Sequence, residues 1–250
     1  SYQAPDAENF SAHNPFKNHF AALLWEVNQV PGIKRLHFTA PHPREFDDEV
    51  IEAMALPAHL NFLHLPVQSG DNEVLRRMNR KHTVEDFEDA IRRVREKIPN
   101  IALGTDLIVG FCGETPEQFE KTVKLFQRVK FDMSYHAMYS QRSGTAAAKA
   151  FKDDVSPEEK RRRWDVIQEL LIKTVLELNQ KYVGQSVSVL VERCEEAIHH
   201  EKAEKMCYGF SRELKLSRFP GDESLVGKIV DVKINKADKW LLEGEYVQTA

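Results

Sequence analysis

The sequence has no long apolar run, and this excludes one class of protein. None of its 250 residues lies in a stretch that approaches the roughly 18 consecutive apolar residues of a membrane-spanning helix. The first twenty residues include Asp6, Glu8, His13 and Pro15, so they do not resemble a secretory signal. The sequence therefore predicts no membrane partner and a cytoplasmic location.

The chain is also poor in cysteine. Its three cysteines, Cys112, Cys194 and Cys207, show none of the close spacings that metal or redox motifs use. We therefore expect no metal site in this chain. We expect each cysteine to be a small, unpaired residue of a protein in a reducing compartment.

An excess of positive charge is missing too. The formal net charge is −4, with 35 Lys and Arg against 39 Asp and Glu. Residues 183–250 are no exception, since they carry 10 Lys and Arg against 12 Asp and Glu. Binding to nucleic acid through bulk charge is thus disfavoured, DNA is not an expected partner, and any RNA contact must be local.

What is present is a pattern of alternating strands and helices up to about residue 140, which is typical of a parallel α/β sheet with crossover helices. A first helix that includes Phe16 and Val27 is expected to end at Pro31-Gly32. Thr83 with Asp86, and Thr115-Pro116 with Gln118, predict capped helix starts. Strands are predicted at residues 33–39, 60–66, 101–109 and 131–139.

Beyond the long helix that begins at Ser156-Pro157, the pattern changes. Short alternating segments at residues 186–191, 213–218, 228–234 and 240–247 predict a small β-barrel. We place the boundary near residue 183, which gives two domains, residues 1–182 and residues 183–250.

Polar residues follow each predicted strand of the first domain. In parallel α/β barrels the reacting groups lie beyond the C-terminal ends of strands, so these residues are expected to converge on one pocket. The segments Gln68-Ser69-Gly70 and Arg142-Ser143-Gly144 could also be ordinary turns. The strand-end candidates are His42, Gln68, Ser69, Thr105, Asp106, Glu114, Tyr139, Arg142 and Thr145.

Four of these segments carry a specific resemblance. FTAPHPREF (38–46), HLPVQSGDNEVLRRMNRKHT (64–83), TDLIVGFCGET (105–115) and YSQRSGT (139–145) resemble successive strand-end motifs of the MiaB family of methylthiotransferases. Val183-Gly184-Gln185 and FPGDESLVGKIVDVKI (219–234) resemble the TRAM domain of that family. The resemblance implies a partial (β/α) barrel that binds S-adenosylmethionine (SAM) and a 4Fe-4S cluster, followed by an RNA-binding TRAM barrel.

By the same resemblance, the enzyme would add a methylthio group to an isopentenyl-type modified adenosine beside the anticodon of tRNA. Arginine can grip a carboxylate with two hydrogen bonds, and glycine permits a close backbone approach, so the residue types suit the ligand. No catalytic residue and no sulfur donor can be assigned. The resemblance assigns the SAM contacts to Gln68, Ser69, Ile108, Val109, Gly110 and Arg142, with Glu114 as an organiser of the loop.

The sequence departs from the family at one decisive point. The family holds its cluster with a CxxxCxxC motif, because three thiolates leave one iron for SAM, and this chain has no such motif. Cys112 stands where relatives commonly carry proline, and this single cysteine cannot replace the CxxxCxxC motif. We expect the chain, which opens on Ser1, to be the C-terminal portion of a longer enzyme and to be inactive by itself.

Two other functions stay open. One is the sister branch, which methylthiolates an aspartate of a ribosomal protein, and the other is an RNA-binding or scaffold protein that has lost catalysis. Under the tRNA hypothesis, Lys160 to Arg163 could contact phosphates, although helix-surface charges are more often only solvated. The first candidates for RNA contacts are Arg76, Arg77, Arg80 and Lys81.

Overall fold

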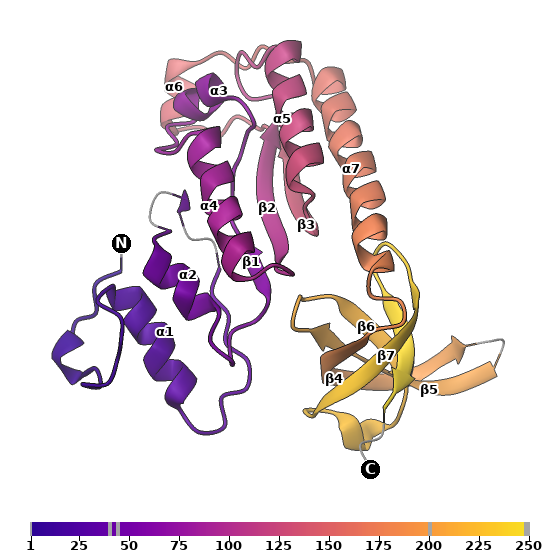
Figure 1. Ribbon diagram of the computed structural model, residues 1–250. Helices are drawn as coiled ribbons and strands as arrows, with labels where there is room; N and C mark the ends of the chain where they lie inside the picture. The colour runs from indigo at the N-terminus through magenta and orange to yellow at the C-terminus, as the bar shows by residue number, and fades with distance from the viewer. Residues whose placement is uncertain (1, 40–41, 44–45, 200–201, 248–250) are drawn as a thin grey trace. The chain divides into compact units, whose positions relative to one another are not determined.

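The computed structural model describes residues 2–39, 42–43, 46–199 and 202–247 (Figure 1). The chain divides into two compact units, residues 1–171 and residues 172–250. The division falls inside the long helix α7, whose C-terminal part groups with the second unit. Among the described residues, none of the helices combines the length and the apolar character that crossing a membrane requires.

The first unit is an α/β structure in which β1, β2 and β3 form a parallel sheet in that order. Phe62 pairs with Ala102, and Gly104 pairs with Met133. The predicted α/β class is confirmed. Its elements are η1 (Ala7–Asn9), α1 (His19–Gln29), α2 (Asp48–Met54), β1 (Phe62–His64), α3 (Asn72–Arg77), α4 (Val84–Lys97), β2 (Ala102–Val109), α5 (Pro116–Val129), β3 (Met133–Met138), α6 (Ala146–Ala150) and α7 (Pro157–Gln180).

Local sequence signals account for where the crossover helices begin. The Thr83 side chain accepts from the Asp86 amide while Asp86 accepts from the Thr83 amide, and Thr115 and Gln118 form the same reciprocal pair. Each pair satisfies two N–H groups that the first helical turn would otherwise leave without a partner. Phe126 and Phe87 then pack on Phe131, with ring centroids 5.1 and 6.2 Å away, and form the core between helices and sheet.

The second unit contains a closed five-stranded barrel with the strand order β4-β5-β6-β8-β7. Alternate residues of its strands, such as Val187, Val189 and Val191 of β4, point into one apolar core around Phe219. The predicted small β-barrel is confirmed. Its elements are β4 (Ser186–His199), β5 (Lys202–Ser211), β6 (Leu216–Pro220), η3 (Glu223–Leu225), β7 (Ile229–Ala237) and β8 (Leu242–Tyr246).

One strand prediction was wrong, and one strand was not predicted. The segment 33–39 forms only an isolated parallel bridge between Leu36 and His59. Strand β5 was not predicted, because its first half is charged and Met206 and Cys207 are both buried in succession, which breaks the alternation.

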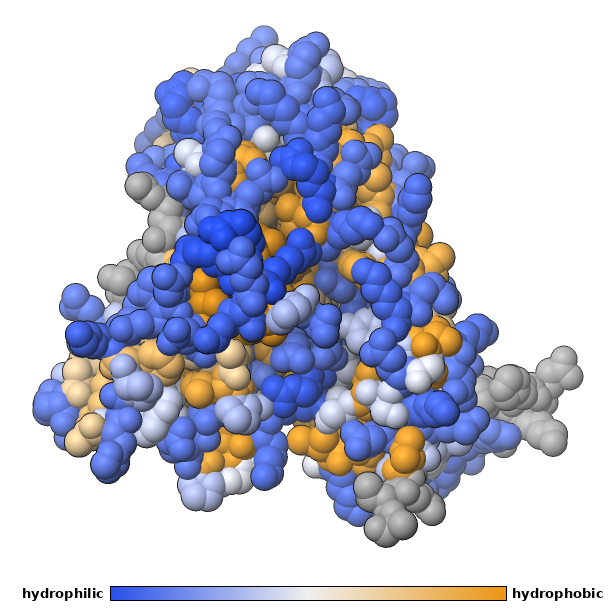
Figure 2. Space-filling view, in the orientation of Figure 1, coloured by the Kyte–Doolittle hydropathy of each residue, from blue (hydrophilic) through white to orange (hydrophobic). Residues whose placement is uncertain are grey.

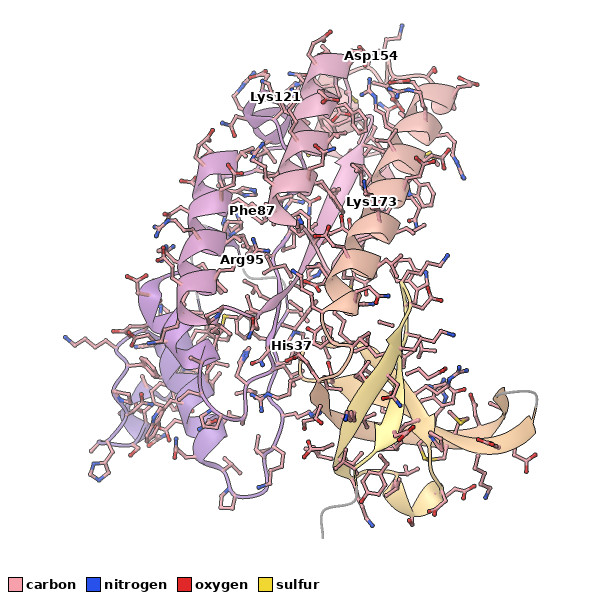
Figure 3. All side chains as sticks on the ribbon, turned by 45° about the vertical axis from the view of Figure 1, so that its right-hand side comes forward. His37, Phe87, Arg95, Lys121, Asp154 and Lys173 are labelled. Carbon is pink, nitrogen blue, oxygen red and sulfur yellow. A yellow bond between two sulfur atoms is a disulfide. The ribbon has the colours of Figure 1, made fainter. Side chains whose placement is uncertain are left out.

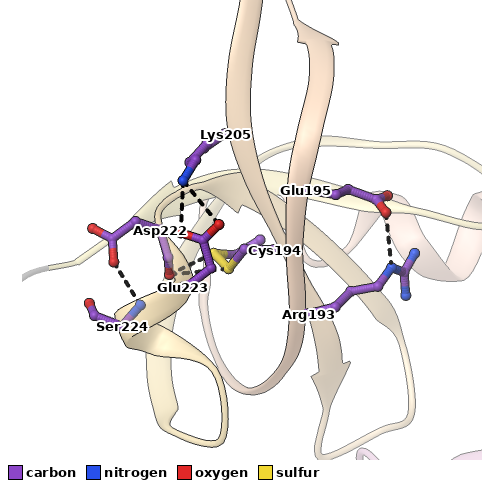
Figure 4. Close-up of a disulfide and its surroundings, with 8 residues drawn as sticks. Arg193, Cys194, Glu195, Lys205, Asp222, Glu223 and Ser224 are labelled. Atoms are coloured by element: carbon purple, nitrogen blue, oxygen red, sulfur yellow. Dashed lines mark hydrogen bonds and ion pairs between the residues drawn. A yellow bond between two sulfur atoms is a disulfide. The ribbon is translucent and has the colours of Figure 1, made fainter.

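The prediction of three unpaired cysteines was wrong for two of them. Cys194 and Cys207 lie opposite each other in the β4–β5 pairing and form a disulfide (Figure 4). Their separation of 13 residues carries no motif, and only the strand pairing brings them together. The third cysteine, Cys112, is free and buried, as expected for a small core residue.

Candidate functional site

The C-terminal ends of β1, β2 and β3 lie at one edge of the sheet because all three strands are parallel. Side chains from the following loops meet there; for example, the Gly113 amide donates to Asp154 Oδ1 at 2.6 Å. Figure 3 shows Asp154 at this end of the α/β unit and His37 toward the other. This edge is where the sequence placed the candidate pocket.

Gln68 is fixed beside the end of β2. Its amide donates to the Asp106 carbonyl at 2.8 Å, and its own carbonyl accepts from the Ile108 amide at 3.0 Å. Its backbone is left-handed, with φ at 73°, a conformation that costs a non-glycine residue energy and is kept only where neighbours enforce it. The structure thus brings together Gln68 and Ile108, two of the predicted ligand contacts.

Ser69 lies next to Gln68 but faces the protein interior. It is fully buried, its hydroxyl lies 3.5 Å from the Thr122 hydroxyl, and it accepts from the Asp71 amide at 3.2 Å. A Cβ at Gly70 would come within 2.5 Å of the Thr122 Cα, so only glycine lets this loop approach α5 so closely. In this arrangement the Ser69 side chain ties the loop to α5.

The loop after β2 is organised around a buried carboxylate. Glu114 Oε2 accepts from the Gly110 amide at 2.6 Å and from Arg163 Nη1 at 2.8 Å, while the Glu114 carbonyl accepts from the same guanidinium at 3.0 Å. Burial raises the pKa of Glu114, and the Gly110 amide and Arg163 act in the opposite direction. Glu114 is therefore enclosed within the loop, which suits its predicted role as an organiser.

Arg142 lies in the loop after β3, at the same sheet edge. The Tyr139 amide donates to the Val109 carbonyl at 2.8 Å, which keeps this loop beside the end of β2. The Arg142 carbonyl accepts from the Thr145 hydroxyl at 2.9 Å, and Thr145 in turn caps α6. The Arg142 side chain is exposed, so its guanidinium is accessible to an anionic group.

The other strand-end candidates have structural partners. The Thr105 hydroxyl donates to the Leu65 carbonyl at 2.9 Å and is fully buried between two strands. The ring of His42 lies 5.3 Å from the ring of His82. Burial is the main cause of the raised pKa of Tyr139. The hydrogen bond of Thr105 and the ring contact of His42 do not require a ligand.

The strands themselves carry a polar pair, His64 and Asp106, of which the sequence predicted only Asp106 as a site residue. His64 Nε2 lies 3.0 Å from Asp106 Oδ1, and the exposed Tyr135 ring lies 5.7 Å from the His64 ring. Gly104 makes room, since a Cβ there would lie 2.7 Å from His64 Nδ1. Burial, and then the charge of His64, lowers the pKa of His37. Polar residues at alternate positions of otherwise apolar strands were the available signal.

The predicted RNA contacts separate into two kinds. Arg77 is mostly buried and donates to the Cys112 carbonyl at 2.6 Å and to Gln118 Oε1 at 2.9 Å. Arg76 pairs with Glu73 and is exposed, Arg80 is exposed, and exposed Lys81 donates to Asn79. Arg77 therefore holds the loop after β2 against α3, and its neighbours remain at the surface.

Two grooves lie on the side of the helices, and the second reaches Gly70 and Asp71 in the loop after β1. A groove of about 450 Å³ is lined by residues of α4 and α5, and one of about 670 Å³ continues toward α3. Figure 2 shows a mainly hydrophilic face over these helices, with apolar side chains visible between them. Both grooves are lined by charges of both signs, such as Glu88 with Arg128, so neither selects an anionic ligand.

The strand-end geometry agrees with a comparison of the chain with known families. The family model of the Radical SAM superfamily matches residues 9–126. Residues 9–126 are therefore similar to radical SAM domains. The loops of Gln68 and of Gly110 to Glu114 lie inside the matched residues, whereas Arg142 and Arg163 lie beyond them.

Relatives extend the likeness over nearly the whole chain. The tRNA-2-methylthio-N(6)-dimethylallyladenosine synthase of Acetivibrio thermocellus is 41% identical over 230 residues, which are 92% of this chain and 47% of that protein. The protein of the same name from Geobacillus kaustophilus is 42% identical over 229 residues, 91% of this chain and 42% of its own length. The resemblance to the methylthiotransferases is thereby confirmed, and the chain spans about half the length of these relatives.

A solved structure was also matched. The coproporphyrinogen III oxidase of Escherichia coli, described as a radical SAM enzyme, aligns with a TM-score of 0.46 and 22% identity over 70% of this chain and 46% of that one. The assignment of the barrel as a TRAM domain stays a prediction.

The cysteines of this chain do not fit an iron–sulfur cluster. Cys112 is the only cysteine among residues 9–126 and is 2% exposed, and Cys194 and Cys207 are joined to each other. Among the described residues, no group of three or more His, Cys, Asp or Glu side chains is arranged to hold a metal ion. A cluster that needs three closely spaced thiolates has no ligands here.

Proposed function

We propose that this chain is the C-terminal portion of a radical SAM methylthiotransferase that acts on a dimethylallyl-type adenosine of tRNA in the cytoplasm. The observation that carries the proposal is the 41–42% identity, over more than nine tenths of the chain, to relatives named for that reaction. Their name favours the tRNA branch over the branch that modifies a ribosomal protein. In such an enzyme, bound SAM and a 4Fe-4S cluster supply the radical that activates the substrate carbon.

The SAM site in this proposal is the sheet edge formed by Gln68, by the chain from Ile108 to Gly110, and by Arg142. The amides of Ile108 and Gly110 already donate to Gln68 and Glu114. A base at this edge would therefore be read by backbone carbonyl oxygens, which suit the amino group of adenine. Arg142 would pair with the carboxylate of the methionine moiety, and Glu114 would hold the loop without touching the ligand.

The Ser69 hydroxyl has a smaller part in the proposal than the sequence assigned to it. It is engaged with Thr122 and Asp71, so a ribose contact would have to come from Gln68 instead. Because the chain offers no cluster ligands, we propose that it does not generate a radical by itself. The CxxxCxxC motif would belong to the part of the enzyme outside this chain.

RNA binding is assigned to the barrel and to the exposed cations near α3. Arg76, Arg80 and Lys81 remain candidates for phosphate contacts, because their charged groups lie at the surface. Arg77 is withdrawn, since its guanidinium is occupied by Cys112 and Gln118. The sulfur donor stays unassigned.

The first test measures SAM binding by equilibrium dialysis with the full-length enzyme, reconstituted with iron and sulfide. Arg142→Ala should weaken SAM binding roughly 10- to 100-fold, because a charge-assisted hydrogen bond contributes about 1.5–3 kcal/mol. Arg161→Ala, which removes another exposed arginine of the same unit, should leave the affinity unchanged. An unaltered affinity in Arg142→Ala would remove Arg142 from the site.

The second test concerns the reaction. A strain that lacks the gene should lose the methylthio group from its dimethylallyl-adenosine, as measured by mass spectrometry of tRNA nucleosides. Complementation with the full-length gene should restore it, and complementation with residues 1–250 alone should not. Retention of the methylthio nucleoside in the deletion strain would refute the proposed substrate and leave the ribosomal-protein or scaffold alternatives.

A further inference from the structure

The basic run at the start of α7 is divided between surface and interior. The side chains of Arg161 and Arg162 are 62% and 56% exposed, as expected for a solvated helix face. Those of Lys160 and Arg163 are only 9% and 2% exposed. A buried cation is costly unless it is paired, so the partners of these two residues indicate what the run does.

Arg163 binds the loop that follows β2. Its Nη1 donates to Glu114 Oε2 at 2.8 Å and to the Glu114 carbonyl at 3.0 Å, and its Nε donates to Glu159 Oε1 at 2.7 Å. Since the same Glu114 oxygen accepts from the Gly110 amide, a continuous chain of hydrogen bonds links α7 to the backbone of Gly110.

Lys160 binds the ends of two strands at once. Its Nζ donates to Asp153 Oδ1 and Oδ2 at 2.6 and 2.7 Å and to the Tyr139 carbonyl, at the end of β3, at 3.1 Å. Its aliphatic part passes over Gly110 so closely that a Cβ on that residue would collide with the Lys160 Cγ. Lys160 therefore packs on the same glycine that Arg163 reaches through Glu114.

We propose that Arg163 and Lys160 are positioning residues for the ligand site at the sheet edge. Together they fix the backbone of Gly110 and the end of β3, between which the proposed function places SAM; the inference rests on that proposal. A loop that is already ordered binds its ligand without an ordering cost, so removal of either cation should weaken binding although neither touches the ligand.

The test measures SAM affinity and the hydrogen exchange of the amides of residues 110–114 in the full-length reconstituted enzyme. Arg163→Met should weaken SAM binding roughly tenfold and raise exchange at Gly110. Arg163→Lys should retain part of the affinity, because it keeps the charge but loses the planar, multiple hydrogen bonds. Arg162→Met, one residue away and exposed, should change neither quantity.

A purely structural role makes a different prediction. Phe126→Leu destabilises the same unit from its core without touching the loop, and should leave SAM affinity and loop exchange as they are in the folded protein. If Arg163→Met does not fold, Arg163→Lys and Lys160→Met provide the comparison. Unchanged SAM affinity in folded Arg163 and Lys160 variants would overturn the inference, whereas a wild-type enzyme that binds no SAM would overturn the proposed function.

Discussion

The α/β unit and the barrel unit differ in where they place charge. In the α/β unit the Arg163–Glu114 pair is 2% and 1% exposed, and it fixes a strand-end loop. In the barrel unit the Lys205–Glu223 pair stays at the surface (Figure 4). The core of the barrel is built from apolar side chains around Phe219. The strands of the closed barrel pair with one another all the way round, with the Arg218–Glu243 ion pair added between β6 and β8, whereas the open parallel sheet has strand-end loops that side chains hold.

The largest effect should follow from emptying the core of one unit. Phe219 is fully buried in the barrel, and Phe219→Ala should destabilise the barrel by about 3–5 kcal/mol. Phe126→Ala is the matched change in the α/β unit, where Phe126 is 1% exposed. Two thermal transitions, each lowered by one variant only, would establish the units as independent; one shared transition would contradict this comparison.

Substitution by alanine should destabilise the protein to different extents at two glycines that have left-handed backbones. Gly110→Ala adds a collision with Lys160 to the strain of its φ of 69° and should cost about 2–4 kcal/mol. Gly227→Ala, in the barrel unit, has a φ of 80° but nothing within 4 Å, so about 1 kcal/mol is expected. Urea unfolding measures both. Equal costs would indicate that Lys160 does not crowd Gly110.

Reduction of the disulfide should affect the barrel only. The Cys194–Cys207 bond closes a loop of 13 residues, which restricts the unfolded chain and stabilises the barrel by about 2–3 kcal/mol. Calorimetry with and without reductant should show a lower barrel transition and an unchanged α/β transition, because the α/β unit contains only Cys112. A Cys194→Ser variant should be insensitive to reductant.

The smallest expected effect is a loss of folding stability at low pH. Hydrogen bonds from Arg162, and then from Arg163, lower the pKa of Glu159 to about 2. Because the pKa of Glu159 is lower in the folded than in the unfolded chain, its ionised form stabilises the folded state at pH values above the ordinary pKa of 4.5. This contribution is lost as the pH falls toward 2. Because Glu159 is partly exposed, at most about 1 kcal/mol is expected. The stability difference between wild type and Glu159→Gln should therefore vanish between pH 4.5 and 2.

Much of the fold could be predicted because its signals are local. The Thr83 and Thr115 caps began their helices as expected, and the sheet edge gathered Gln68, Gly110 and Glu114 because parallel strands end together. The disulfide could not be predicted, since the partner strand β5 lacks an alternating pattern. The inward direction of the Ser69 side chain could not be predicted either, because it depends on α5, which lies some fifty residues further along the chain.

The sequence by itself determined the alternation of strands and helices in the α/β unit and the loops that carry polar residues, because these depend on residues close together in the chain. Only the tertiary structure decided which charges are buried. Lys160 and Arg163 stand in a run of four basic residues that looks uniform. Two of them point into the protein because positions three residues apart share one face of a helix, and this face is turned toward the ends of β2 and β3, where Glu114 and Asp153 compensate the charges.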